Sequence, residues 1–344
     1  MNILSIGPLW RGSNAGGLFR ALSRQGCIIE TIDEFYYVSL QSKSTVLKIF
    51  EKTIRPLQEK EFNTTIRKKI QLSKPDILFI YKGAFVQSET LEFAKKNKCK
   101  LALFYPDVSL TFHGKNIPAS IPLYDIIFTT KTFGIDDLSQ KFGVKNSIFI
   151  PHGFDPEMHR KLAIDEKTLS IFGCDVSFIG AWSPKKEKIL SLLKEKLPQI
   201  NLKIWGDLWN RANSENIISS IQGNSVLGDL YALAIQCSKI NLGILSEKVS
   251  GASSGDLITS RTFHIPGASG FMLHEKNIES IQYFKEDEEV VFFEDSEDLV
   301  NKITYYLNNP ELRTKIQNAG YQRALLEHSL DSRAKTIIKY LKNI

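Results

Sequence analysis

The stretch best suited to chemistry is Ser260–Glu275, which reads SRTFHIPGASGFMLHE. A short helix there is expected to lead through glycine into a buried strand. Arg261 offers a bidentate guanidinium fork to phosphate oxygens at the start of that helix. Gly267 and Gly270 allow backbone to approach a ligand closely. The pattern predicts a site for a phosphate-bearing ligand.

A second basic site is expected where the strand Val176–Ile179 ends. Gly180 closes this strand, and Pro184 opens a helix whose first turn carries Lys185 and Lys186. A lysine at that position opposes the helix dipole, so helix stability does not explain the choice of residue. A bound diphosphate does explain it, and a pair of solvated lysines is the plain alternative.

The loop after the first predicted strand, Gly7–Gly17 (GPLWRGSNAGG), is a third candidate for phosphate binding. It opens a helix, where backbone N–H groups and the helix dipole favour anions. Gly12 and Gly16 are its candidate contact residues. The loop matches neither GxGxxG nor the P-loop signature, so a turn without a ligand is the alternative.

Asp107 is the candidate catalytic residue because it follows the predicted strand that ends at Tyr105. A carboxylate there acts as a general base toward an acceptor hydroxyl, or only orients it. Aspartate after proline is also a common turn residue, which is the structural alternative. His113 and His152 are the alternative bases, although loop or packing roles are commoner for such histidines.

A framework of buried strands must position these residues. Short apolar runs alternate with helix-length segments, as in parallel sheets covered by helices. In the N-terminal half the runs are Ile3–Ile6, Ile28–Ile32, Ile77–Tyr81, Leu101–Tyr105, Ile126–Thr129 and Ile148–Ile150. In the C-terminal half they are Val176–Ile179, Leu202–Trp205, Ile240–Leu245, Gly270–Leu273 and Val290–Phe293.

The pattern restarts after the loop Pro151–Pro156 and polar sequence that runs to Gly173. Two doubly wound α/β domains joined in that region are therefore predicted, as the 344-residue length also suits. Three helices are expected to follow in the tail. Their predicted start signals are Asp295 with Ser296, then Pro310, then Asp331.

Composition narrows the function classes. The net charge of +6 is small and dispersed, so nucleic acid is not an expected partner. With no signal-like start and no run of roughly 18 apolar residues, a cytoplasmic protein is expected. The four cysteines lie far apart, the histidines are ungrouped, and no DxD follows an apolar strand. Buried reduced thiols, with no metal and no cofactor, are the expectation.

One segment, residues 43–70, is locally basic and has apolar residues at intervals of three to five. This spacing predicts helices with an apolar face. Such a surface suits peripheral contact with an anionic membrane, at its inner face, and access to a lipid-linked acceptor. The commoner arrangement is a helix that packs its apolar face on the core and exposes its lysines to solvent.

At Ser260–Glu275 the chain resembles the CgeB-like (spore maturation protein) branch of the group-1 glycosyltransferases, which reads R-x-F-E-I-x-A-x-G-G-F-x-L-x-E there. The likeness spans nearly the whole chain, and the order and spacing of its pieces carry more weight than any one piece. The other pieces are Lys74–Asp76, Pro151–Pro156, Asp175–Gly180, Ile204–Asp207, Lys239–Leu242, Glu289–Phe293, His328 and Arg333.

The resemblance implies a GT-B fold, with two facing Rossmann-like doubly wound domains, an interdomain cleft and a C-terminal helical tail. It implies an acceptor domain at 1–155, a nucleotide-sugar domain at 170–315, and helices at 316–344 that pack back across the N-terminal domain. The implied activity is a metal-independent hexosyltransferase of polysaccharide biosynthesis. It would move a sugar from a nucleotide-diphosphate sugar to a hydroxyl of a glycan, a lipid-linked or another acceptor.

Carried over by position, the donor-side residues are Gly180, Lys185, Lys186, Arg261, His264, Gly270, Phe271 and Glu275. Two positions depart from the pattern, because His264 replaces a glutamate and Met272 stands where related enzymes often hold a second one. A neutral imidazole offers one donor and one acceptor, unlike a carboxylate. Glu275 is the substitute candidate for the ribose contact.

Two other functions fit the same scaffold. A nucleotide-sugar epimerase would convert the donor without any acceptor. A non-catalytic nucleotide- or carbohydrate-binding protein would bind the donor but neither transfer nor hydrolyse it, and His264 is the residue that keeps this alternative open.

Overall fold

The computed structural model describes residues 1–38, 45–223 and 225–344, and the side chains of all of these except 45–50. Residues 43 and 44 of the basic segment therefore lie outside the described residues. The chain divides into two compact units. Unit 1 comprises Met1–Pro151, Lys248–Ser254 and Arg333–Ile344, and unit 2 comprises His152–Glu247 and Gly255–Ser332.

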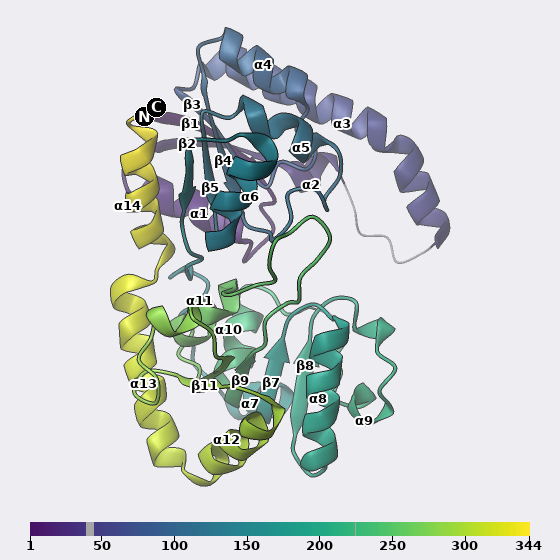
Figure 1. Cartoon of the computed structure of the whole chain (residues 1–344), viewed down its shortest axis with the longest axis vertical. Coiled ribbons are helices and arrows are strands. Elements are labelled where there is room, and N and C mark those ends of the chain that lie inside the picture. Colours follow the sequence, from purple (N-terminus) through teal and green to yellow (C-terminus); the bar gives the residue numbers. More distant parts are fainter. Residues whose placement is uncertain (39–44, 224) are drawn as a thin grey trace. The chain divides into compact units, whose positions relative to one another are not determined.

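Unit 1 is built on a parallel six-stranded sheet with the order β2-β1-β3-β4-β5-β6 (Figure 1). Its strands are β1 (Asn2–Gly7), β2 (Ile28–Asp33), β3 (Ile77–Tyr81), β4 (Lys100–Tyr105), β5 (Ile126–Thr129) and β6 (Ser147–Phe149). The central strands are apolar along their whole length because helices bury both faces. Strand order reverses between β1 and β3, which is where ligands bind in open α/β sheets.

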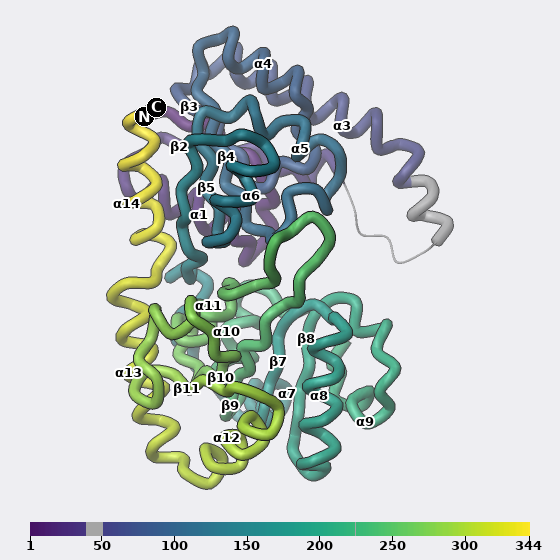
Figure 2. The backbone as a smooth tube through the Cα atoms, viewed as in Figure 1, coloured from purple at the N-terminus to yellow at the C-terminus, as the bar shows by residue number. Residues whose placement is uncertain are grey.

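The helices of unit 1 follow the strands in the expected alternation. They are α1 (Asn14–Arg24), α2 (Glu34–Tyr37), α3 (Thr45–Ser73), α4 (Ser88–Lys96), α5 (Asn116–Ser120) and α6 (Thr132–Phe142), with a 3-10 turn at Ile121–Leu123. Helix α1 starts at Ser13, whose Oγ accepts the backbone N–H of Gly16 at 3.0 Å. The long helix α3 packs along α4 (Figure 2).

The described part of the basic segment is a single helix, α3, and the second half of its apolar face is core. Phe62, Ile66 and Ile70 are fully buried in unit 1, whereas Leu57 is 70% exposed. Among the described side chains, the core-facing arrangement therefore holds from Phe62 onward. None of the described helices has the length and apolar character needed to cross a bilayer.

Unit 2 is built on a parallel five-stranded sheet with the order β11-β10-β9-β7-β8. Its strands are β7 (Cys174–Ile179), β8 (Leu202–Trp205), β9 (Ser238–Gly243), β10 (Met272–Glu275) and β11 (Val291–Phe293). Its helices are α7 (Glu166–Phe172), α8 (Pro184–Lys196), α9 (Glu215–Ile218), α10 (Asp229–Gln236), α11 (Ser260–Gly267), α12 (Ser296–Asn308) and α13 (Pro310–Glu327), with 3-10 turns at Trp209–Arg211 and Ser280–Gln282. Two doubly wound α/β units are thus confirmed.

The tail forms the three predicted helices, of which the last is α14 (Leu330–Leu341). Asp295 caps α12 as expected, since its carboxylate accepts two backbone N–H groups of the first turn. The expected cap of α14 is wrong. Asp331 lies inside that helix, and the Oγ of Ser329 instead accepts the N–H of Ser332 at 3.3 Å. A serine one residue before the helix outcompetes an aspartate already within it.

Two segments distant in sequence complete unit 1. Residues 333–341 of α14 belong to unit 1, and Ile337 among them is fully buried. The ring of Tyr340 meets the ring of Phe128 edge-on, with ring centres 6.4 Å apart. The short segment Lys248–Ser254 is held by polar bonds, among them Ser109 Oγ to the Ser250 carbonyl at 2.7 Å. The four cysteines are free and buried, as predicted.

Gly267 has a steric role at the end of α11. A Cβ added there would stand 2.4 Å from Cγ of Phe154, whose ring is fully buried. The sequence motif had suggested that this glycine lets backbone approach a ligand. Its close neighbour is instead a core side chain of the same unit.

We expect Gly267→Ala to destabilise unit 2 by about 1–3 kcal/mol, the usual cost of overpacking, although alanine is the better helix former. Urea unfolding of the full chain measures this. Adding Phe154→Leu to the same chain should recover part of the loss, because the smaller side chain makes room. Strictly additive effects of the two substitutions would contradict the contact.

Candidate functional site

The candidate donor residues of unit 2 gather at the carboxyl ends of its strands. Gly180 follows β7, Glu275 ends β10, and Arg261 lies in the first turn of α11. The start of helix α11 is fixed there because the Oγ1 of Thr262 accepts the backbone N–H of Thr259 at 3.1 Å. The local sequence therefore sets the position from which Arg261 reaches the sheet edge.

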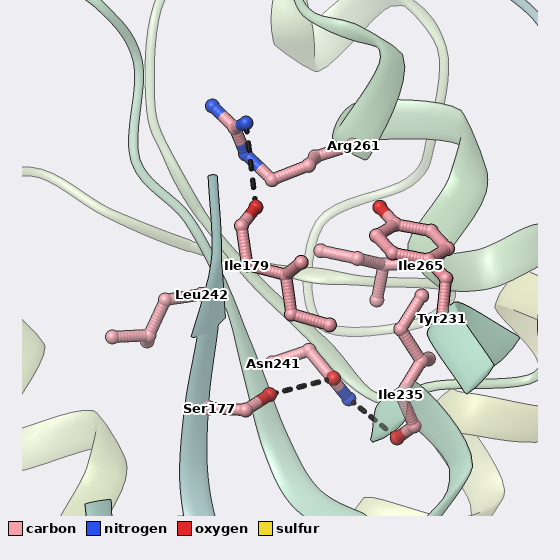
Figure 3. A pocket seen from close by; sticks show the side chains of 8 residues that line it. All are labelled: Ser177, Ile179, Tyr231, Ile235, Asn241, Leu242, Arg261 and Ile265. Atoms are coloured by element: carbon pink, nitrogen blue, oxygen red, sulfur yellow. Dashed lines mark hydrogen bonds between the residues drawn. The ribbon is translucent and has the colours of Figure 1, made fainter. Parts of the chain in front are cut away.

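Arg261 spans the ends of two strands. Its Nη2 donates to the Ile244 carbonyl at 2.9 Å. Its Nη1 donates to the Ile179 carbonyl at 3.4 Å, a bond that Figure 3 shows. The guanidinium carbon stands 5.3 Å from the centre of the Phe178 ring. Burial lowers the pKa of Arg261, against the pull of Tyr231 and of more distant carboxylates.

Lys186 is a second cation on the same aromatic ring. Its ammonium lies 6.0 Å from the ring centre of Phe178 and donates to the Ala181 carbonyl and to Ser246 Oγ, at 3.1 and 3.0 Å. The residue is only 4% exposed. Burial, together with the neighbouring Arg261, lowers the pKa of Lys186 to about 8.

Within the described part of the chain, neither of these cations forms an ion pair with a carboxylate. Glu187, the sequence neighbour of Lys186, is used elsewhere. Its carboxylate accepts bonds from the Trp182 indole and from the N–H groups of Asn213 and Ser214, at 2.6 to 2.8 Å. Two buried positive groups thus share one edge with no carboxylate in direct contact, although Glu247, Asp256 and Glu275 act on them at longer range.

Lys185 has a different partner. Its Nζ lies 2.6 Å from Oε1 of Glu275, whose other oxygen accepts the backbone N–H of Leu245. The family resemblance placed Lys185, Lys186 and Arg261 together among the donor-side residues. The structure brings Lys186 and Arg261 together and neutralises Lys185 with Glu275.

The start of α8 is already occupied by a carboxylate. Glu247 accepts a bond from Ser183 Oγ at 2.7 Å and from the N–H of Lys185 at 3.3 Å. These bonds, opposed by burial, leave the pKa of Glu247 lowered. The positive character of this loop therefore comes from the Lys186 side chain rather than from a bare helix end.

Gly180 gives the Arg261 side chain its space. A Cβ on Gly180 would stand 2.7 Å from Nη1 of Arg261 and 3.0 Å from the Phe178 ring. Any side chain at this position would displace the guanidinium. The glycine at the end of β7 is thus explained by the Arg261 side chain, which occupies the space where a Cβ of residue 180 would lie.

His264 is stacked on another histidine. Its ring lies 3.9 Å from that of His159, and Tyr231 meets both rings edge-on. Burial holds the pKa of His264 well below its usual range, with His159 and His152 adding to the effect. The imidazole is therefore neutral, and its Nε2 has no hydrogen-bond partner among the described residues.

Gly270 and Phe271 belong to the core. A Cβ on Gly270 would meet Ile235 at 2.4 Å, and Phe271 is fully buried against Tyr306, with ring centres 5.0 Å apart. Any effect of these two residues on a donor is consequently indirect. Met272 is likewise buried.

A small pocket lies beneath Arg261. Its lining includes Tyr231, Ile265 and the bonded pair Ser177 and Asn241 (Figure 3). The space between these side chains leaves almost no room for a water molecule. This pocket is thus a gap under the guanidinium and does not hold a whole nucleotide sugar.

In unit 1, Asp107 forms a polar cluster with two side chains. Its Oδ2 lies 2.8 Å from Nζ of Lys82 and 3.2 Å from Nε2 of His113. Burial raises the pKa of Asp107, but Lys82 and His113 lower it further, so the carboxyl is ionised. His152, the other alternative base, is a buried residue of unit 2.

The loop after β1 lies at the same sheet edge as Asp107. Gly12 has a φ of 86°, and Gly16 lies in the first turn of α1, where the Ser13 side chain already takes up its N–H. Asp33 at the end of β2 accepts the N–H of Leu9 at 3.0 Å. Gly12 and Gly16 thus belong to unit 1, whereas the other donor candidates belong to unit 2.

Sequence reasoning missed two residues of the unit 1 edge. Lys82 directly follows β3 and has a φ of 70°, a left-handed conformation that is unusual for lysine. Glu34 directly follows β2 and is buried. For Lys82 the available signal was a charged residue immediately after an apolar strand, whereas β2 reads IIETID and gives no such signal for Glu34.

Residues 185–339, a little under half of the chain, match a family model described as glycosyl transferase-like. No curated protein matches the sequence. Among solved structures the chain is similar to a glycosyltransferase from Rickettsia africae ESF-5, with 16% identity, a TM-score of 0.63, and 99% of this chain and 98% of that chain covered.

It is also similar to Anabaena Alr3699/HepE in complex with UDP-glucose, with 11% identity, a TM-score of 0.66 and both chains fully covered. A UDP-GlcNAc 2-epimerase from Neisseria meningitidis bound to UDP-GlcNAc matches at 12% identity and a TM-score of 0.56, again over 100% of each chain. Together with the two Rossmann-like units, these likenesses confirm the GT-B fold class, and the C-terminal half carries a glycosyl transferase-like domain.

Proposed function

We propose that this protein transfers a sugar from a nucleotide-diphosphate sugar to a hydroxyl acceptor. The observation that carries the proposal is the pair of buried cations, Lys186 and Arg261, which share the Phe178 ring and have no carboxylate partner among the described residues.

Burying an unpaired charge is costly unless another group compensates it. Neutral carbonyls and a serine hydroxyl solvate Lys186 and Arg261 only partly. A diphosphate would supply the missing negative charge and accept charge-assisted hydrogen bonds from both. The same two groups would stabilise the charge that develops on the leaving diphosphate during transfer.

The reaction balances with residues already described. The acceptor oxygen bonds to the anomeric carbon while the bond from that carbon to the diphosphate oxygen breaks, and its electron pair stays on the nucleotide diphosphate. Asp107, ionised beside Lys82, would take the proton of the acceptor hydroxyl. We propose unit 1 as the acceptor side and unit 2 as the donor side, with no metal needed for the charge of the leaving group.

The comparisons support this proposal from two sides. The matched family model covers the part of unit 2 that holds Lys186 and Arg261. A solved structure of the same fold binds UDP-glucose, which makes UDP-sugars the first donors to test. The finer hypotheses, a CgeB-like hexosyltransferase acting in polysaccharide biosynthesis, rest on the sequence motifs.

An epimerase is the second candidate, because an epimerase of the same fold binds UDP-GlcNAc. Incubating the protein with UDP-GlcNAc alone separates the two. Conversion of the sugar without an acceptor supports the epimerase, and stable donor until an acceptor is added supports transfer.

The donor site is tested by a thermal-shift screen over UDP-, GDP-, dTDP- and CMP-sugars. A true donor at about 100 times its Kd stabilises the native state by about 2.7 kcal/mol. We expect Arg261→Ala to weaken binding at least tenfold, since hydrogen bonds to charged groups contribute about 1.5–3 kcal/mol. Arg323→Ala on α13 is the matched control and should keep the ligand-induced shift. An unchanged shift in Arg261→Ala would remove Arg261 from the site.

The protonation of Lys186 should appear in the pH dependence of binding. Because its pKa is about 8 in the free protein, the ammonium is present below that pH and lost above it. We expect affinity for UDP-glucose to fall by roughly tenfold between pH 7 and pH 9, measured by calorimetry. Lys186→Met should bind weakly and flatten this dependence. Lys188→Met, an exposed lysine on the same helix, should retain it, and an equally steep fall in both variants would contradict the assignment.

Asp107 is tested by UDP release in the presence of donor and acceptor sugars. Removing a general base typically lowers the rate by roughly 10²–10⁴-fold. We expect Asp107→Asn to show that loss while its donor-induced thermal shift stays intact. Asp136→Asn, an exposed aspartate on α6, serves as the control. Near-normal turnover in Asp107→Asn would sink the catalytic role.

A further inference from the structure

Glu34 is a buried carboxyl group for which the proposed transfer has no use. The residue is 6% exposed, and its Oε2 has no hydrogen-bond partner among the described residues. Burial raises the pKa of Glu34 to about 7, and the charged groups that act on it are Lys82 after β3, which lowers it, and Asp33 at the end of β2, which raises it.

The fold does not require this carboxyl. Asp33, not Glu34, caps α2, because its Oδ1 accepts the N–H of Phe35 at 3.0 Å and that of Leu9 at the same distance. An unsatisfied buried polar group destabilises the native state. A residue that costs stability and contributes no structural bond is a candidate for ligand binding.

Its place in the sheet points the same way. Glu34 follows β2, Lys82 follows β3 and Asp107 follows β4, so the three flank the point where strand order reverses. Neighbouring strands lie about 4.8 Å apart, which puts the ends of β2 and β4 within roughly 15 Å of each other. This span suits one or two sugar rings.

Two aromatic side chains stand exposed on loops at this edge. Trp10, in the loop after β1, is 39% exposed, and Phe112, in the loop after β4, is 61% exposed beside His113. Aromatic rings offer flat apolar faces on which the C–H face of a pyranose can stack. Carboxyl and imidazole groups at the same sheet edge can bond its hydroxyls.

The charge of the cluster selects among sugars. Lys82 is paired with Asp107, so this pair carries no net charge. The unit 2 edge, by contrast, holds two unpaired cations. An anionic sugar or a phosphate would find no free cation in the Lys82–Asp107 pair, whereas a neutral sugar needs none.

We propose that the carboxyl edge of the unit 1 sheet binds a neutral saccharide, with Glu34 bonding one of its hydroxyls and with Trp10 and Phe112 as stacking faces. This inference rests on the proposed function in that it names the class of acceptor. Its test does not need transfer to occur.

The test uses saturation-transfer NMR on the full chain with methyl glucoside, methyl galactoside and methyl mannoside, and with glucose 6-phosphate as the anionic probe. We expect at least one methyl glycoside to receive saturation. Glu34→Met should weaken that binding by roughly fivefold or more, as expected for loss of one hydrogen bond. Glu34→Gln, which keeps donor and acceptor atoms, should retain part of it. Glu92→Met, an exposed glutamate on α4 of the same unit, is the control and should leave the binding unchanged.

Folding of the variant is checked by melting at several pH values. A raised pKa in the native state means that the stability of the wild type declines as pH rises from about 4.5 to about 7, where the unfolded chain has released a proton that the native Glu34 still holds. Glu34→Met should therefore melt at least as high as the wild type, and its advantage should grow over that window.

The outcomes separate the two proposals. Equal saturation in wild type and Glu34→Met overturns the role of Glu34. Binding of glucose 6-phosphate with no methyl glycoside binding overturns the neutral class. A missing UDP-sugar thermal shift in the wild type counts against the proposed transfer alone, because it reports on unit 2, and Glu34→Met should keep that shift.

Discussion

The organisation of unit 2 depends on one constraint, the placing of two cations on one aromatic ring without a carboxylate to match them. Phe178 supplies the face, and Arg261 crosses over Gly180 because that position has no side chain. Glu187 is adjacent to Lys186 but is bonded to Trp182 and to two backbone N–H groups, so it stays out of reach. Glu247 and Glu275 also act on the two cations, but each is bonded to other groups and forms no ion pair with either.

At the equivalent edge of its sheet, unit 1 holds a lysine that forms an ion pair with an aspartate. Lys82 approaches Asp107 to 2.8 Å, and the left-handed backbone at Lys82 helps to direct it there. A paired edge and an unpaired edge attract different chemistry. The unpaired cations of unit 2 suit an anionic donor, and the neutral Lys82–Asp107 pair suits a hydroxyl acceptor. This electrostatic difference distinguishes two sheets whose topology is otherwise alike.

The sequence predicted the strands well because buried parallel strands are apolar along their whole length, and such runs are legible without tertiary information. Arg261 and Lys186 could also be predicted from the sequence, because local structure does not explain a basic residue at either position. The contacts between side chains could not be predicted from the sequence in this way. The ion pair of Lys185 joins residues of β10 and α8 that lie far apart in the chain, and no spacing rule reveals it. Likewise, Phe271 resembled a ligand contact by position, yet its burial against Tyr306 depends on a helix 35 residues later.

His264 is best understood through the same imbalance. The pattern that the sequence resembles has glutamate at this position, close enough to Arg261 for the two charges to interact. A carboxylate there would neutralise part of the positive edge. The buried imbalance at Phe178 is therefore larger in this chain than the pattern would give, because the stack with His159 and Tyr231 keeps the imidazole neutral. Nε2 has no hydrogen-bond partner among the described residues, so the ring keeps one atom able to form a hydrogen bond without adding a negative charge beside Arg261.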